Sequence, residues 1–168
     1  MKFLKGISLT KIDNYKYIVL IYLMLSNKRL VNEIKLLKKD PLPDIKIILD
    51  DNNIYEMLAE VKGPEDTIYQ TGTFKLLIKI PNDYPIKPPS IKFLKPIFHP
   101  NIYRDGKICL DVLLQEWSPV QNIRTILISI RSLLADPNPN SPANREAATL
   151  YLKDINEFNK RVLQSISI

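Results

Sequence analysis

The chain has 168 residues, of which 45% are hydrophobic and 25% charged, which is typical of one folded domain and excludes a disordered protein. Its single cysteine and single histidine exclude an internal disulfide and the usual four-ligand zinc site. We therefore expect no metal, and the lone thiol is typical of a reducing compartment such as the cytoplasm or nucleus.

The net charge of +6 is concentrated at the N-terminal end. Residues 1–40 hold nine Lys or Arg against three Asp or Glu, whereas residues 41–168 hold fifteen of each. A nucleic-acid-binding domain more often carries its basic residues on the folded body, interleaved with aromatic residues. We expect no direct nucleic-acid binding, and we interpret the basic end as a docking surface for an acidic protein partner.

Residues 1–24 differ from the rest and are interpreted as an N-terminal extension. Four lysines precede the apolar run YIVLIYLML at 17–25, which is shorter than the roughly 20 apolar residues that span a bilayer. The run has the length of a signal-peptide core, but no small-residue cleavage site follows. We interpret the segment as an appended extension or as an upstream start ahead of Met24, and we expect no membrane partner.

A domain of residues 25–168 is expected to open with a helix. Ser26 or Asn27 can cap its N-terminus, and Pro41 cannot continue it, so the helix should end by residue 40. Its apolar stripe at helical spacing consists of Leu30, Ile34 and Leu37.

Three segments then alternate apolar and charged residues with a period of two. They are 53–61, 73–80 and 90–93, and a shorter strand is expected at 45–49. This pattern predicts a four-stranded antiparallel meander with one covered face. The links are rich in turn residues, and the prolines of YPIKPP at 84–89 predict an extended, rigid loop.

Regular structure is expected to stop for about 25 residues after Leu94, a length typical of functional loops. Helical spacing returns at about 121–134, and DPNPNSP at 136–142 ends that helix. A last helical region is expected from Ala143 to about Gln164, in two pieces. One helix, four strands and then helices predict an α+β fold.

The long loop contains HPNIYRDGKICLDV at 99–112. A lone cysteine is commonly a buried, inert residue, but the position of Cys109 after a glycine turn in an irregular loop favours a nucleophile. A thiol of ordinary pKa, about 8.5, is only a few per cent thiolate at pH 7 and is still very nucleophilic. Such a thiol suits exchange with an activated thioester and suits amide hydrolysis poorly without a general base.

Two neighbours could assist Cys109. His99 would make the Cys-His pair of a protease, but it precedes Pro100 in a tight segment, and we interpret it as a structural residue of the loop. Asn101 could donate its amide to a developing oxyanion, a contact worth about 3–4 kcal/mol. It could also hold its own turn backbone, and both roles are compatible.

These motifs resemble the signature of ubiquitin-conjugating enzymes. That family has His-Pro-Asn, the catalytic cysteine eight residues after the asparagine, and then Trp-Ser-Pro, which is here WSP at 117–119. The resemblance extends from about Leu25 to Val162 and includes GPEDTIYQTGTFKLLI, YPIKPP and DPNPNSPAN. NPNSPAN and HPNIYRDGKICLD most resemble the branch that serves DNA-damage tolerance and histone ubiquitination, whereas Ile86, Lys107 and the LLQE before Trp117 depart from it.

The resemblance implies a transferase of UBC-like fold. Cys109 would accept ubiquitin as a thioester from the activating enzyme and pass it to substrate lysines, possible substrates being histones or a replication clamp. Asn101 would stabilise the oxyanion or order the loop. No cofactor is implied, because the activating enzyme consumes the ATP. The remaining implied positions are Tyr103, Asp111 and Ser141 lining the site, Lys28 and Arg29 docking the activating enzyme, and Ile86, Ser118 and Pro119 docking a RING-type ligase.

Alternatives remain open. Lys28 and Arg29 would also suit a plain solvated face. A catalytically inactive relative would only bind ubiquitin or a partner, although Cys109 at the family's spacing from Asn101 argues against it. A cysteine hydrolase would depend wholly on Cys109 and His99, and transfer of another ubiquitin-like modifier is excluded by resemblance alone.

Ser141 precedes Pro142, which suits a proline-directed kinase. A phosphate would add about −1.5 to −2 charge beside the acceptor lysine and tune its attack. The alternative interpretation is a turn serine in a loop rich in proline and asparagine.

Overall fold

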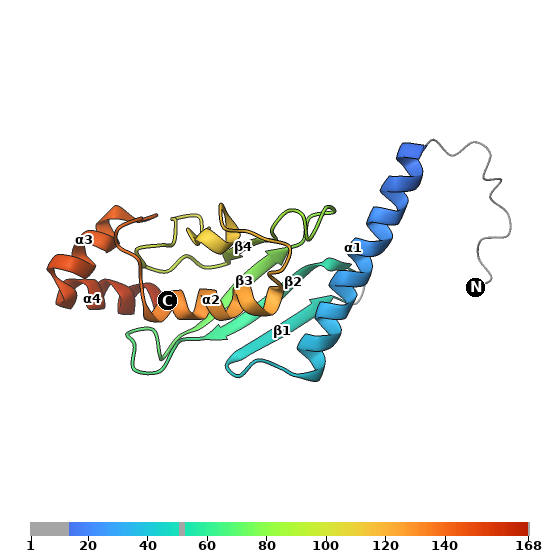
Figure 1. The fold of residues 1–168 in the computed structure, drawn as a ribbon. Coiled ribbons are helices and arrows are strands. Elements are labelled where there is room, and N and C mark those ends of the chain that lie inside the picture. The colour runs from blue at the N-terminus through green and yellow to red at the C-terminus, as the bar shows by residue number, and fades with distance from the viewer. Residues whose placement is uncertain (1–13, 51–52, 168) are drawn as a thin grey trace.

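The computed structural model describes residues 14–50 and 53–167 and has the α+β architecture that the sequence predicts, with a helix, a four-stranded sheet and then helices (Figure 1). Helix α1 lies at one end of the molecule, and α3 and α4 lie at the other. The elements in chain order are α1 (Asn14–Lys39), β1 (Ile45–Asp50), β2 (Asn53–Lys62), β3 (Thr73–Lys79), β4 (Ser90–Phe93), the 3-10 helix η1 (Asp111–Leu113), α2 (Ile123–Ala135), α3 (Arg145–Lys153) and α4 (Ile155–Ile166).

The four strands form the expected antiparallel meander in the order β1-β2-β3-β4. Alternate positions face the core, so that in β3 the side chains of Phe74, Leu76 and Ile78 are buried while Lys75 and Lys79 are exposed. The period of two in the sequence therefore correctly identified the buried face. All four strands start where expected, β4 also ends where expected, and the other three end within one residue of the expected position.

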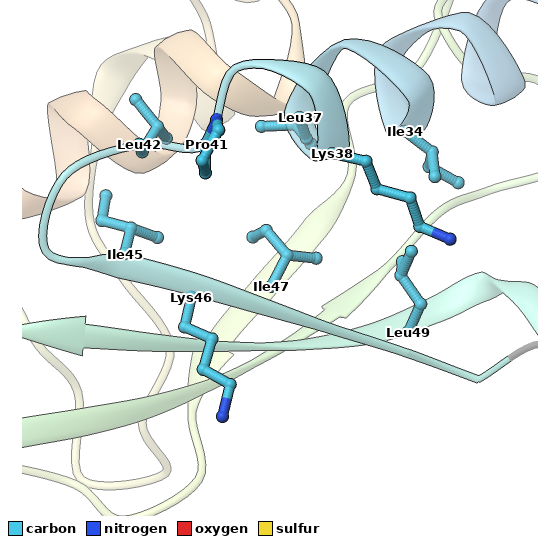
Figure 2. A pocket seen from close by; sticks show the side chains of 9 residues that line it. All are labelled: Ile34, Leu37, Lys38, Pro41, Leu42, Ile45, Lys46, Ile47 and Leu49. Atoms are coloured by element: carbon cyan, nitrogen blue, oxygen red, sulfur yellow. The ribbon is translucent and has the colours of Figure 1, made fainter.

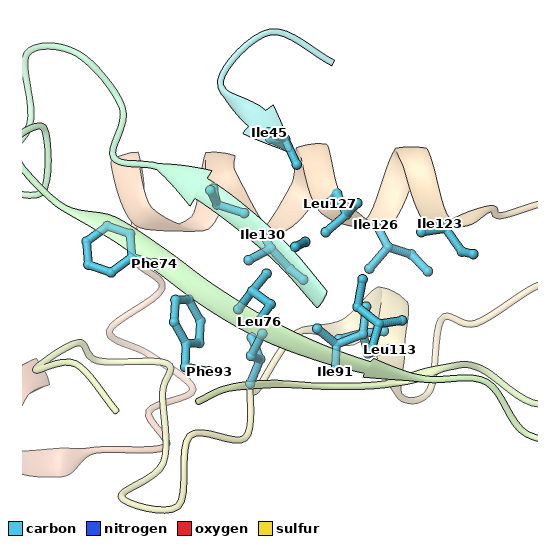
Figure 3. Packing of buried hydrophobic residues seen from close by; sticks show 14 of the residues in the cluster. Ile45, Phe74, Leu76, Ile91, Phe93, Leu113, Ile123, Ile126, Leu127 and Ile130 are labelled. Atoms are coloured by element: carbon cyan, nitrogen blue, oxygen red, sulfur yellow. The ribbon is translucent and has the colours of Figure 1, made fainter. Parts of the chain in front are cut away.

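Helix α2 covers this buried face (Figure 3). Its apolar side chains recur at helical spacing, and Ile126, Leu127 and Ile130 lie against the strands that carry Leu76 and Phe93. All five of these side chains are almost fully buried. Burying each large apolar side chain contributes about 1.5–3 kcal/mol, and the resulting core fixes the sheet that leads into the long loop.

The prediction for the start of the first helix was wrong. A cap at Ser26 or Asn27 was expected, but α1 is continuous from Asn14 to Lys39. No glycine or proline interrupts residues 14–39, and an apolar run continues a helix as readily as it precedes one. The Asn27 side chain accepts a hydrogen bond from the Tyr55 hydroxyl. The expected boundary between residues 24 and 25 lies within α1, and residues 1–13 of the expected extension lie outside the described residues.

Helices α2 and α3 begin two residues after their expected starts at 121 and 143, because asparagines cap them. The side chain of Asn122 accepts from the backbone N–H of Thr125 in a capping box, and Asn144 caps α3 in the same way. The last helical region is divided in two as predicted, since Asp154 ends α3 and caps α4. Such caps satisfy N–H groups that a helix leaves without partners.

One buried acid joins α1 to α2. Glu33 has 7% of its surface exposed, and its carboxylate accepts hydrogen bonds from the Tyr84 hydroxyl at 2.8 Å and from the backbone N–H of Ile123 at 2.9 Å. Arg29, one helical turn earlier, forms an ion pair with the same carboxylate. The contact thus connects α1, the loop at residue 84 and the N-terminus of α2.

Candidate functional site

Residues 101–109 form a small hairpin inside the long loop. The backbone N–H of Cys109 donates to the carbonyl of Asn101 at 2.8 Å, Ile102 pairs with Ile108, and the N–H of Tyr103 donates to the carbonyl of Lys107 at 2.9 Å. The eight-residue spacing of Asn101 and Cys109 therefore places these two residues directly opposite each other.

Gly106 turns the tip of the 101–109 hairpin. Its φ is +86°, and a Cβ added there would lie 2.1 Å from the carbonyl oxygen of Phe93. The N–H of Phe93 donates in turn to the Gly106 carbonyl at 2.9 Å. The hairpin is thus held against β4, and only glycine fits the position.

The side chain of Asn101 connects the hairpin to the 138–141 loop. It is 1% exposed, its Nδ2 donates to the carbonyls of Asn138 at 2.8 Å and Ser141 at 3.2 Å, and its Oδ1 accepts from the N–H of Asn138 at 2.8 Å. Both amide hydrogens therefore have acceptors within the chain. In this arrangement the side chain orders the loop, and donation to an oxyanion would require one of these bonds to break.

His99 is buried, and both of its ring nitrogens bond backbone groups. Nδ1 accepts from the N–H of Asn101 at 2.9 Å, which leaves Nε2 to donate to the carbonyl of Leu133 at 2.9 Å. Burial lowers the pKa of His99 from 6.5 to about 4. A neutral ring with both nitrogens occupied is poorly suited to deprotonate Cys109, as a cysteine hydrolase would require.

Cys109 is a half-buried free thiol. Tyr103 is 44% exposed, and the pKa of its phenol is raised chiefly by the charge of the neighbouring Cys109. Ser141 is exposed on the loop that Asn101 holds, and Asp111 is exposed at the start of η1. The structure thus gathers Cys109, Tyr103, Asn101 and Ser141 around two adjoining loops, with Asp111 two residues beyond the thiol.

A surface hollow of about 800 Å³ lies beside these loops. The tip of the hairpin, from Tyr103 to Lys107, forms one wall, and residues 143–146 at the start of α3 form the other. Because Tyr103 both lines the hollow and neighbours Cys109, a chain segment lying in the hollow would pass close to the thiol.

The two proposed docking residues of α1 differ. Lys28 is exposed. The guanidinium of Arg29 pairs with Glu33 and donates from Nη2 to the carbonyl of Gln121 at 2.9 Å. Arg29 therefore joins α1 to the segment before α2, and its charge is already paired within the chain.

The positions that we expect to dock a ligase lie on two segments that Trp117 connects. Its indole N–H donates to the carbonyls of Pro85 at 2.9 Å and Ile86 at 3.1 Å. Ile86 is 60% exposed, and Ser118 and Pro119 follow Trp117 directly. The 84–89 segment was expected to be extended, but it opens with turns, because Ile86 donates its N–H to the carbonyl of Asp83 at 2.8 Å.

A second hollow, of about 470 Å³, lies between the end of α1 and the edge strand β1 (Figure 2). Its walls are mainly apolar, with Lys38 and Lys46 at its margin. None of the residues expected to serve the site lines it. Among the described helices, none combines the length and apolar character needed to cross a membrane.

Three contacts of Glu33, Trp117 and Asn138 were not predicted from the sequence. Glu33 was counted only as a charge, although its position beside Ile34 on the apolar stripe is a signal of burial. Trp117 and Asn138 lay within the quoted motifs without a role. Their partners lie more than 30 residues away in the chain, so no local pattern could have identified them.

The chain is similar in sequence to known proteins. Residues 29–166 match the family model of ubiquitin-conjugating enzymes. Over 141 residues the chain is 48% identical to ubiquitin-conjugating enzyme E2 3 of Arabidopsis thaliana, a match that covers 84% of this chain and 94% of that relative. It is 45% identical over 141 residues to ubiquitin-conjugating enzyme E2 1 of Caenorhabditis elegans, a match that covers 84% of this chain and 73% of that relative. The matched range includes the 101–109 hairpin, Trp117 and the 138–141 loop.

Proposed function

The chain belongs to the ubiquitin-conjugating enzyme family and is a ubiquitin-conjugating transferase, and on that premise we propose that Cys109 carries the ubiquitin. The observation that carries this proposal is a free, half-buried thiol on a hairpin closed by Asn101, at the family's spacing. Tyr103, which neighbours the thiol, lines an open hollow that an acceptor can enter.

The proposed chemistry is a thioester exchange followed by aminolysis of the new thioester. The Cys109 thiolate attacks the thioester carbonyl between ubiquitin and the activating enzyme, a new C–S bond forms, and the activating enzyme's thiolate leaves. A lysine amine then attacks the new thioester, forms an amide bond and loses a proton, and the Cys109 thiolate departs. Neither step needs a cofactor on this chain, since ATP is consumed earlier by the activating enzyme.

Asn101 is proposed to act in the second step by holding the 138–141 loop next to the hairpin. This places Ser141 beside the incoming lysine, with Tyr103 and Asp111 lining the approach. Phosphorylation of Ser141 would add negative charge there. Ser141→Ala and Ser141→Asp should then differ in discharge rate, and equal rates would contradict that role.

The proposed partners follow from the exposed positions. Lys28 on α1 is proposed to contact the activating enzyme, with Arg29 positioning the helix, and Ile86, Ser118 and Pro119 to contact a RING-type ligase. Substrates of histone or replication-clamp type, a role in DNA-damage tolerance and a location in the cytoplasm or nucleus are proposed from the NPNSPAN and HPNIYRDGKICLD motifs.

The test is a loading reaction with activating enzyme, ATP and ubiquitin, resolved on gels with and without reductant. A reductant-sensitive adduct on the unchanged chain, absent from Cys109→Ala, supports the proposal. No adduct with ubiquitin or a related modifier would instead favour an inactive binding module. Cleavage of ubiquitin amides that is abolished by His99→Ala would favour the hydrolase.

A further inference from the structure

The hollow between the tip of the 101–109 hairpin and the start of α3 is lined by more unpaired basic than unpaired acidic side chains. Two carboxylates line it, and each is paired within the chain: Asp105 with Lys107 at 3.0 Å and Glu146 with Arg161 at 3.0 Å. Two further cations, Arg104 and Arg145, line the same hollow from opposite walls.

Neither Arg104 nor Arg145 has an ion-pair partner among residues 14–50 and 53–167, and both are exposed. The folded body as a whole is balanced, since residues 41–168, the hollow included, contain fifteen basic and fifteen acidic side chains. Two uncompensated guanidiniums facing one hollow therefore give it a local positive potential that the overall charge of the body does not predict.

The position of Arg145 strengthens this potential. It is the first residue of α3, where the helix dipole places partial positive charge and disfavours a cation. Arg104 lies on the tip of the hairpin, which Gly106 and its bond to Phe93 hold against β4. The backbone that presents each arginine is thus fixed before any ligand binds, which lowers the entropic cost of binding.

We propose that this hollow binds an acidic segment of the substrate, rich in Asp or Glu, next to the lysine that attacks the thioester. The inference rests on the function proposed above and names the substrate class for that same site. Guanidinium groups match carboxylates by paired hydrogen bonds. A segment held between Arg104 and Arg145 passes Tyr103, which neighbours Cys109, so its lysine comes within reach of the thioester.

The test uses the full chain loaded with ubiquitin and measures single-turnover discharge. Two peptides serve as acceptors, one with a single lysine flanked by Asp and Glu and a matched one with Asn and Gln in their place. The readout is the ratio of the two rates within each variant, so that any change in the thioester itself cancels. Free lysine is a third acceptor.

We expect the unchanged chain to prefer the acidic peptide by roughly two- to fivefold for each arginine, as is typical of an exposed ion pair. Arg104→Ala and Arg145→Ala should each remove their share of the preference, and Arg145→Glu should bring the ratio of the two rates close to one, because its repulsion offsets the attraction of Arg104. The matched control is Lys153→Ala, which removes an exposed cation from the last turn of α3 and should keep the full ratio. The preference should also fall as salt is raised, because the screening length shortens.

Equal rates for the two peptides, with free lysine still accepting ubiquitin, would overturn this inference and leave the proposed function standing. An equal loss of preference in Lys153→Ala would also overturn it, since the effect would then come from net charge. Failure to discharge to any lysine would overturn both. Replacing either exposed arginine should leave the melting temperature nearly unchanged, which thermal unfolding checks.

Discussion

The carboxylate of Glu33, in α1, accepts a hydrogen bond at 2.9 Å from the backbone N–H of Ile123, the first residue of α2. The two residues are 90 positions apart in the chain. An anion is favourable at a helix N-terminus, where N–H groups lack partners. Glu33 therefore supplies from another helix the negative charge that the first turn of α2 lacks.

We predict that Glu33→Ala lowers the free energy of unfolding by about 1–3 kcal/mol, because it leaves the N–H of Ile123 and the hydroxyl of Tyr84 buried without an acceptor. Urea unfolding measures this change. Glu56→Ala is the control, since Glu56 pairs with Lys79 on the surface at 3.0 Å and should cost less than about 1 kcal/mol. Equal losses in the two variants would contradict the special role of Glu33.

Asn101→Ala should load ubiquitin but discharge it slowly. The substitution removes the bonds that hold Asn138 and Ser141, at a cost of about 1–3 kcal/mol in stability, so amide hydrogen exchange should rise at 138–141. Gel assays of loading and discharge, run beside exchange measurements, check both expectations. Slow discharge with unchanged exchange would show instead that the amide acts directly on the oxyanion.

His99 predicts a loss of stability in mild acid. Its folded pKa, about 4, lies below the ordinary 6.5, so the unfolded chain binds a proton first and stability falls as the pH drops through this window. The expected loss between pH 6.5 and 5 is about 1.6 kcal/mol, because the full slope of about 1.4 kcal/mol per pH unit is reached only well below pH 6.5. Urea unfolding at both values measures it, and His99→Gln should give a flatter profile. If stability fell equally with pH in the unchanged chain and in His99→Gln, His99 would not be the source of the pH dependence.

Trp117→Phe should affect ligase-dependent discharge more than ligase-free discharge. It keeps an aromatic ring but removes the N–H that binds the carbonyls of Pro85 and Ile86, at a cost of about 1 kcal/mol. The exposed Ile86 then loses its fixed position. Discharge rates are measured on the same loaded variant with and without a RING-type ligase. If the two rates change by the same factor, the substitution does not act through ligase docking.

Gly106→Ala should destabilise the 101–109 hairpin. Alanine is strained at a φ of +86° by about 1–3 kcal/mol, and its Cβ would meet the Phe93 carbonyl at 2.1 Å. We expect a lower melting temperature and slower loading of Cys109. Lys107→Ala, at an exposed neighbouring position, is the control and should leave the melting temperature nearly unchanged.

The predictable parts of the fold were those with a local cause. Alternation identified the strands because each has one covered face, and Pro41 identified the end of α1 because proline cannot continue a helix. The start of α1 was not predictable from Ser26 or Asn27, since a residue that can cap a helix can also lie inside one. A residue that excludes a conformation, as Pro41 excludes a continued helix, therefore predicts a boundary more reliably than a residue that only permits one.

The site was predictable only in part, for a related reason. Asn101 was chosen as a donor by residue type, but its partners at 138 and 141 depend on how two distant loops meet. Arg29 was expected to dock a partner because it is a charged residue on a helix. Its guanidinium instead pairs with Glu33 and donates to the carbonyl of Gln121. Tertiary contacts determine which polar groups remain available to bind a partner or substrate. These contacts join residues far apart in the chain, so no local sequence pattern reveals them.

The continuity of α1 has a mechanical consequence. With 26 residues the helix is about 39 Å long, and its first turns extend away from the sheet (Figure 1). Glu33, whose carboxylate accepts from the first N–H of α2, lies about 28 Å from Asn14 along the helix axis. A tilt of about 5° around Glu33 would move the far end by about 2.5 Å, so a partner that bound the first turns of α1 would act over that length on the contact with α2.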